Sequence, residues 1–157
     1  MKSTLFACVL LVLLLACPRP SFAQPQHQPR PIRMNHLALQ VSSLEKSTWF
    51  YMQVVGLDSM PEPFHDGRHV WLSLGNTSHL HLILNPATQP IIPAKNTHLC
   101  FSVASVPVFI KVLEQEKIKY EDWAGTPSSV TTRVDGVHQV YLQDPDGYWI
   151  EINDARE

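Results

Sequence analysis

Residues 143–154, with the sequence QDPDGYWIEIND, decide the fold because they combine a turn with a strand that carries one acid. The DPDG segment at 144–147 is typical of a tight turn, and the alternation after it predicts a β-strand. Within that strand Glu151 stands between Ile150 and Ile152. Side chains alternate across a strand, so Glu151 faces the opposite side from the two isoleucines. That side is either solvent or a site that uses a carboxylate.

The chain contains an internal repeat. Residues 34–41, MNHLALQV, align with residues 97–103, THLCFSV, so that His36 falls on His98. Both segments alternate as strands do, and each is followed by serines that predict the start of a helix.

Local signals bound the two predicted helices. Ser42 and Glu45 form a capping box at the start of the first helix, and Gly56 ends it. Ser105 predicts the N-cap of the second helix, whose first turn tolerates Pro107.

The strands after each helix repeat as well. Residues 72–85, LSLGNTSHLHLILN, align with the segment that begins at Leu142, and the alignment places His81 on Glu151. Because the similarities occur in the same order, we predict two copies of a strand–helix–strand–strand–strand unit. The copies span about residues 34–85 and 97–154, and they put the domain in the α+β class.

The first 23 residues have the pattern of a secretory signal peptide. Lys2 precedes an apolar run at 5–16, and SFA at 21–23 is typical of a cleavage site. In an alternative interpretation, the LLAC motif that ends at Cys17 is a lipoprotein signal. We therefore expect a secreted or periplasmic protein, with a membrane anchor only if Cys17 is lipidated.

The composition beyond the signal narrows the class of protein. Residues 24–33 are rich in proline and glutamine and predict a disordered spacer, and one domain follows at 34–157. Cys100 is the single cysteine of that domain, which excludes an intrachain disulfide within it. The chain has 12 Lys and Arg against 14 Asp and Glu, without a basic cluster, and this argues against nucleic-acid binding.

Four positions that the repeat relates carry side chains that bind metals. His36 is equivalent to His98, and His81 is equivalent to Glu151. If the two copies curl around one trough, all four side chains point into it. Imidazole and carboxylate suit one divalent ion such as Zn, Ni, Co, Mn or Fe, and the absence of thiolate ligands argues against a structural zinc site. We predict a metal site formed by these four residues.

Further polar residues lie close to the predicted ligands in the sequence. His79 and Cys100 share strand faces with a ligand two residues away, as candidates for proton transfer or pocket lining, or as ordinary packing residues. The second copy is longer than the first around residues 125–138. This segment, with Arg133 and His138, is a candidate lid.

The arrangement resembles the vicinal oxygen chelate superfamily, which includes glyoxalase I, extradiol dioxygenases, methylmalonyl-CoA epimerases and fosfomycin-resistance thiol transferases. The resemblance covers about residues 34–154. It rests on NHLALQV, WFYMQVVGL, THLCFSV and, most specifically, DPDGYWIEI. It implies two paired βαβββ modules that form an open barrel-like cup around one divalent metal ion.

The resemblance also implies a function. His36, His98 and Glu151 match the family's ligand positions, and His81 stands where glyoxalases and epimerases usually carry Glu or Gln. This implies a metal-dependent enzyme of the lyase or isomerase type that moves a proton on a small oxygen-chelating substrate, with Glu151 and His81 as the catalytic candidates. A homodimer is compatible with it. The histidine at position 81 is a departure from the glyoxalase branch. Ala38 is a departure from the fosfomycin branch, which typically carries Thr at that position.

Two alternatives stay open. A non-catalytic protein of this family would sequester a small molecule such as an antibiotic, with Trp71, Phe101 and Trp149 as apolar lining. An extradiol-type dioxygenase would use a face of two histidines and one carboxylate, which His36, His98 and Glu151 would supply.

Overall fold

The computed structural model describes residues 33–75, 77–87 and 94–156. The predicted signal peptide with Cys17, and nearly all of the predicted spacer, lie outside the described residues. Within the described part of the chain, no helix has the length and apolar character needed to cross a membrane.

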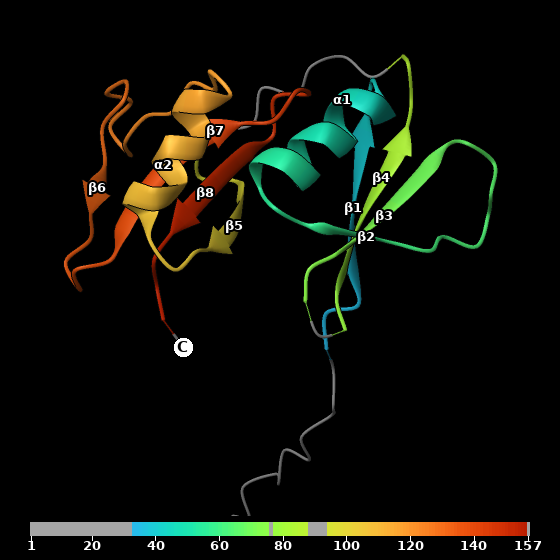
Figure 1. Ribbon diagram of the computed structural model, residues 1–157, viewed down its shortest axis with the longest axis horizontal. Helices are drawn as coiled ribbons and strands as arrows, with labels where there is room; N and C mark the ends of the chain where they lie inside the picture. Colours follow the sequence, from blue (N-terminus) through green and yellow to red (C-terminus); the bar gives the residue numbers. More distant parts are fainter. Residues whose placement is uncertain (1–32, 76, 88–93, 157) are drawn as a thin grey trace, which may run out of the picture. The chain divides into compact units, whose positions relative to one another are not determined.

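The first module forms a mixed four-stranded sheet with one helix against it (Figure 1). Its strand order is β1-β4-β3-β2, and β1 runs parallel to β4 whereas the other pairs are antiparallel. The elements are β1 (His36–Val41), α1 (Leu44–Trp49), a π-helical continuation η1 (Phe50–Val54), β2 (Asp58–Met60), β3 (His69–Ser73) and β4 (His79–Leu84).

The second module repeats this plan. Its strand order is β5-β8-β7-β6, again with one parallel pair, β5 with β8. The elements are β5 (His98–Ser102), α2 (Val106–Gln115), β6 (Thr131–Thr132), β7 (His138–Gln143) and β8 (Trp149–Asn153). The predicted pair of βαβββ modules is thereby confirmed.

The strand register confirms the predicted equivalence of positions 81 and 151. Trp71 on β3 lies opposite His81, and Tyr141 on β7 lies opposite Glu151. On the other side, Ala38 of β1 pairs with His81 just as Cys100 of β5 pairs with Glu151.

The helix caps agree with the prediction at one site and differ at the other. Ser105 caps α2, and its Oγ accepts a hydrogen bond from the amide of Val108. The first helix is capped by Ser43, which accepts from the amide of Lys46, so the prediction of Ser42 as the cap was wrong. The amide of Ser42 instead donates to a carboxylate of the second module, as described below.

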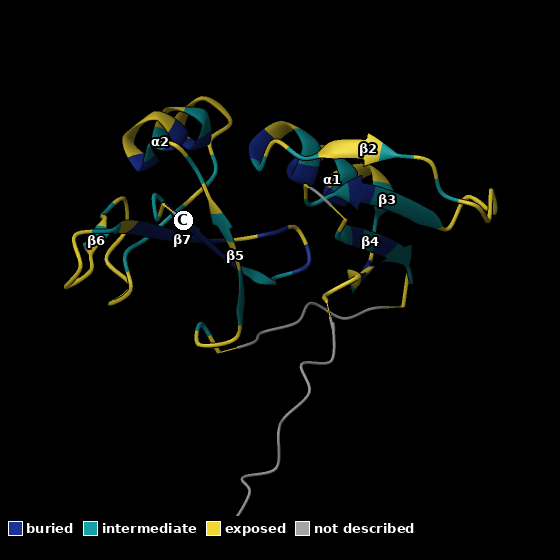
Figure 2. Cartoon of the chain, turned by 90° about the horizontal axis from the view of Figure 1, so that it is seen from below, coloured by how far each residue is buried: buried dark blue, intermediate teal, exposed yellow. Residues whose placement is uncertain are grey.

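The core lies between each sheet and its helix, where buried positions run along the strands (Figure 2). On β8 both Ile150 and Ile152 are completely buried, and α2 contributes Val106, Phe109 and Leu113. Burial of each such side chain contributes about 1.5–3 kcal/mol. The isoleucines therefore fix which face of β8 looks into the core.

The DPDG turn holds the two modules together through two buried carboxylates. Asp146 accepts from the amide of Ser42 at 2.8 Å and from the hydroxyl of Ser47 at 3.0 Å. Asp144 accepts from the hydroxyl of Tyr51 at 2.8 Å. Burial raises the pKa of Asp144, although the hydrogen bond from Tyr51 opposes that effect. The turn is therefore both a hairpin and a contact between modules.

The hydrogen bond from Tyr51 to the turn predicts the effect of removing the Tyr51 hydroxyl group. Tyr51→Phe should lower the free energy of unfolding by about 1–3 kcal/mol, because it removes a donor from a buried carboxylate. Tyr148→Phe is the matched control, since its hydroxyl contacts the carbonyl of Gln40 in an exposed setting at 3.3 Å. Urea denaturation would measure both variants, and equal stability losses would contradict this account of the turn.

Candidate functional site

His98 and Glu151 form one pair of predicted ligands, on the neighbouring strands β5 and β8. His98 Nε2 lies 3.2 Å from Glu151 Oε2. On the other side of the ring, His98 Nδ1 lies 2.7 Å from the carbonyl oxygen of Lys95. A carbonyl only accepts hydrogen bonds, so this contact requires the proton on Nδ1. Nε2 faces the carboxylate of Glu151.

The Glu151 carboxylate is buried and is held by hydrogen bonds. Oε1 accepts from Asn153 Nδ2 at 2.9 Å and from the side-chain amide of Gln139, and Oε2 accepts from the Tyr141 hydroxyl at 2.7 Å. Glu151 is only 5% exposed. Desolvation acts to raise the pKa of Glu151, but these hydrogen bonds outweigh it and lower the pKa. The group is a fixed, ionised ligand candidate.

Cys100 lies beside this carboxylate and shares its hydrogen-bond network. Its Sγ donates to Glu151 Oε1 at 3.4 Å and accepts from Asn153 Nδ2 at 3.1 Å. Desolvation and the neighbouring carboxylate raise the pKa of the thiol to about 12. Cys100 therefore supports Glu151 as a neutral thiol.

His36 and His81 form the second pair of predicted ligands, on β1 and β4. Their rings stack with centroids 4.3 Å apart and an interplanar angle of 8°. His36 Nδ1 lies 2.8 Å from the side-chain oxygen of Asn35, which leaves Nε2 as the free lone pair. Trp71 stacks on the other face of His81 at 4.1 Å.

His81 Nε2 is buried and has no hydrogen-bond partner among the described residues. A buried polar atom without a partner costs about 1–3 kcal/mol, so its retention calls for an explanation. Desolvation and the neighbouring histidines His36 and His79 lower the pKa of His81, which keeps the ring neutral. A neutral imidazole with an unpartnered nitrogen is the form that binds a divalent metal ion. The residues present therefore fit the predicted group.

The structure brings the predicted ligands together as two pairs. Within residues 33–75, 77–87 and 94–156, no group of three or more His, Cys, Asp or Glu side chains is arranged to hold one ion. The four-ligand site of His36, His81, His98 and Glu151 stays a prediction.

The other singled-out residues have local partners. His79 lies 5.9 Å from His81, ring centroid to ring centroid. Arg133 pairs with Asp135 in an exposed turn, and His138 hydrogen-bonds the carboxylate of Asp154. Within the predicted lid, residues 131–132 form β6, which pairs with the start of β7 at His138. The role of this segment as a lid stays a prediction.

Sequence reasoning missed the groups that orient Glu151 and His98. Asn153 is two residues beyond Glu151 and therefore lies on the same strand face, so the sequence alone could have predicted their proximity. Gln139 and Tyr141 required knowledge of the β7–β8 register. Lys95, which supplies the carbonyl to His98, gave no signal, because a single lysine in a connecting segment is usually solvated.

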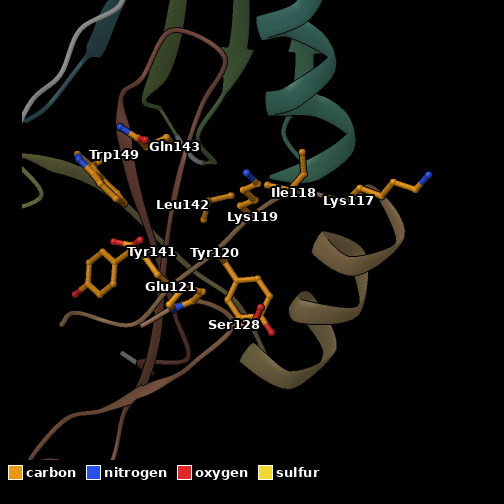
Figure 3. Close-up of a pocket in the computed structure, with 11 residues that line it drawn as sticks. Lys117, Ile118, Lys119, Tyr120, Glu121, Ser128, Tyr141, Leu142, Gln143 and Trp149 are labelled. Atoms are coloured by element: carbon orange, nitrogen blue, oxygen red, sulfur yellow. The ribbon is translucent and has the colours of Figure 1, made fainter. Parts of the chain in front are cut away.

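A pocket of about 740 Å³ adjoins the pair formed by His98 and Glu151 (Figure 3). It shares Tyr141 and Trp149 with the strand face that carries Glu151. The remaining lining comes from the chain between α2 and β7 and from β7 itself, and includes Ile118, Tyr120, Glu121 and Gln143.

Two paired βαβββ modules define the class of α+β protein to which this fold belongs, and the comparison with known families agrees. Residues 33–152 match the Glyoxalase/Bleomycin resistance protein/Dioxygenase superfamily. The chain belongs to this superfamily.

Individual proteins are similar to this chain at a lower level. Glyoxylase I 4 of Arabidopsis thaliana is 28% identical over 125 residues, which cover 76% of this chain and 68% of that protein. The mitochondrial methylmalonyl-CoA epimerase of Mus musculus is 31% identical over 116 residues, which cover 63% of this chain and 65% of that protein. The chain thus spans about two thirds of the length of these relatives.

A solved structure supports the fold alone. The crystal structure of a glyoxalase/dioxygenase from Nostoc punctiforme matches with a TM-score of 0.66 at 24% identity, over 80% of this chain and 92% of that chain.

The hydrogen bonds to Glu151 predict how its ionisation changes in a variant. Tyr141→Phe should raise the pKa of Glu151, because the lost hydroxyl stabilises the charged carboxylate. A carboxyl-carbon NMR titration would measure this in the metal-free protein. Tyr120→Phe, a ring that lines the adjacent pocket, should leave the pKa unchanged. An equal pKa in wild type and Tyr141→Phe would mean that the hydroxyl does not hold the carboxylate.

Proposed function

We propose that this protein is a divalent-metal-dependent enzyme of the glyoxalase type. It catalyses a lyase- or isomerase-type proton transfer on a small substrate that offers two neighbouring oxygens. The observation that carries this proposal is the 3.2 Å contact between His98 Nε2 and Glu151 Oε2, with Nδ1 committed to a carbonyl. A divalent ion can take the place of a proton between Nε2 and the carboxylate, and such an outer contact to a carbonyl is typical of metal-binding histidines. Relatives named as a glyoxylase I and an epimerase support the reaction class.

The ligand set consists of His36, His81, His98 and Glu151. Three imidazoles and one carboxylate suit Zn, Ni, Co, Mn or Fe. When bound, such an ion acts as a Lewis acid that polarises a substrate carbonyl.

The two catalytic candidates differ in how firmly they are held. Glu151 accepts hydrogen bonds from Asn153, Gln139 and Tyr141, and it would have to break these to move toward a substrate. Among the residues that the structure describes, His81 Nε2 has no hydrogen-bond partner, and the ring has a neighbouring ring on each face. We therefore assign to Glu151 the role of a fixed metal ligand. We assign proton transfer to His81, which would either bind the metal ion or accept a proton.

A second copy of the chain completes the site in this proposal. Each chain carries His36 and His81 on its first sheet and His98 and Glu151 on its second sheet. In this proposal the ion takes donors from both pairs. In a homodimer with two-fold symmetry, His36 and His81 of one copy would face His98 and Glu151 of the other, so that two equivalent sites form.

Removal of one ligand should reduce metal binding. His98→Ala should lower the affinity for Zn²⁺ at least tenfold, since one of four donors is lost. Competition titration with a chromogenic chelator would measure it. His138→Ala is the control, because that histidine pairs with Asp154 in an exposed setting. Unchanged Zn²⁺ affinity in His98→Ala would remove the metal site from the proposal.

Mixing two defective variants tests the dimer separately. His36→Ala/His81→Ala and His98→Ala/Glu151→Gln should each bind no Zn²⁺ alone. Refolded together, they should recover about a quarter of the wild-type sites, because half of the dimers are mixed and each holds one intact site of two. If each double variant binds no Zn²⁺ by itself and the mixture also recovers none, the site forms within one chain and the dimer assignment fails.

The pocket beside Tyr141 and Trp149 favours a second candidate function, which is the sequestering of a small molecule without catalysis. The two functions differ in their need for metal. Binding of a ligand that survives EDTA, with no turnover in the presence of Zn²⁺, Ni²⁺ or Co²⁺, would support sequestering over the enzyme.

A further inference from the structure

The ammonium group of Lys95 is placed in a site built from three oxygens. Nζ donates to the carbonyl of Asp122 at 3.0 Å and to the carbonyl of Trp123 at 3.2 Å, and it forms an ion pair with Glu121. An ammonium has three donors, so these acceptors satisfy all of them. The Lys95 side chain is only 15% exposed, and this burial is tolerated because the charge is paired and hydrogen-bonded.

Two aromatic rings enclose the same ammonium. Nζ lies 4.9 Å from the ring centroid of Trp149 and 5.5 Å from that of Tyr141. Figure 3 shows these two rings projecting to the same side of their strands, β8 and β7. Each contact of this kind is attractive, because the face of an aromatic ring carries partial negative charge. Lys95 is thus fixed against the residues that flank Glu151.

The backbone of Lys95 is fixed as well. The amide of Thr97 donates to the carbonyl of Ala94 at 2.8 Å, which closes a turn with Lys95 inside it. The carbonyl of Lys95 points to His98 Nδ1 at 2.7 Å. The side chain and the turn both anchor Lys95, so its carbonyl is held toward the imidazole of His98.

We propose that Lys95 is a positioning residue that selects the Nδ1–H tautomer of His98 and so presents Nε2 to the ion. Without the anchored carbonyl, a neutral ring could place its proton on Nε2 and donate it to Glu151, and neither group would then be ready to bind a cation. The proposal rests on the proposed function for its consequence in metal binding. Its first step, the tautomer, is a property of the metal-free protein.

The first module supplies an internal comparison. Arg33 occupies the position equivalent to Lys95, three residues before His36. It is exposed and makes no hydrogen bond or ion pair with the described residues, and His36 Nδ1 is held by the side chain of Asn35 instead. Only the second module therefore uses a lysine as an anchor, which makes Arg33→Met a matched control.

The test compares Lys95→Met with Arg33→Met in the purified protein. Long-range proton–nitrogen NMR of labelled histidines would report the tautomer of His98 in the metal-free state, above the pH at which the ring is protonated. Lys95→Met should reduce the Nδ1–H form of His98 and lower Zn²⁺ affinity about tenfold. Lys95→Arg, which keeps the charge, should recover part of both. Arg33→Met should change neither.

One result would overturn the proposal. Lys95→Met that keeps the Nδ1–H tautomer, whether or not it is less stable, would show a merely structural role. If Lys95→Met does not fold, Glu121→Gln carries the test, since it removes the ion pair and should shift the tautomer in the same direction. A tautomer shift in a protein whose wild type binds no Zn²⁺ would support the positioning role and remove the metal from the proposed function.

Discussion

The alternation of side chains along β8 is the constraint on which the rest of the site depends. Ile150 and Ile152 are completely buried in the core, so Glu151 must face the opposite side. A shift of one residue would exchange the isoleucines for a carboxylate inside the core, which is strongly unfavourable. Glu151 is nonetheless buried on its own side, and it stays ionised there because its hydrogen-bond donors offset the loss of water.

The start of the same strand is fixed by the turn before it. Asp144 accepts from the amides of Asp146 and Tyr148 with one oxygen and from Tyr51 with the other. The turn is therefore rigid within the hairpin and also tied to η1 of the first module. Acidic residues at this turn combine local geometry with a contact between modules, whereas the equivalent turn of the first module, around Gly75 and Ser78, carries no acid.

The repeat made most of the fold predictable, because periodicity and end signals act locally. The equivalences of His36 with His98 and of His81 with Glu151 followed from aligned strands, and the register agrees with them. The cap was misplaced by one residue, because two adjacent serines offer the same local signal and the side chain of Ser43 is the one that accepts from Lys46. The amide of Ser42 donates to Asp146, a contact across about a hundred residues that no local signal reveals. Lys95 was missed for the same reason: its partners lie in a distant irregular segment. Whether four ligands meet around one ion depends on how modules associate, which alternation along single strands does not determine.

The two pairs are equivalent in position but not in electrostatic character, and this difference suits them to different tasks. Tyr141 opposite Glu151 donates a hydrogen bond, and the surrounding polar groups stabilise a negative charge. Trp71 opposite His81 stacks instead, and its ring shields a neutral imidazole from water. A cation would be attracted first to the carboxylate pair, whose charge is fixed, and the imidazole pair would add donors without adding charge. One carboxylate leaves a divalent ion with excess positive charge, which is what a substrate that develops negative charge on its oxygens requires.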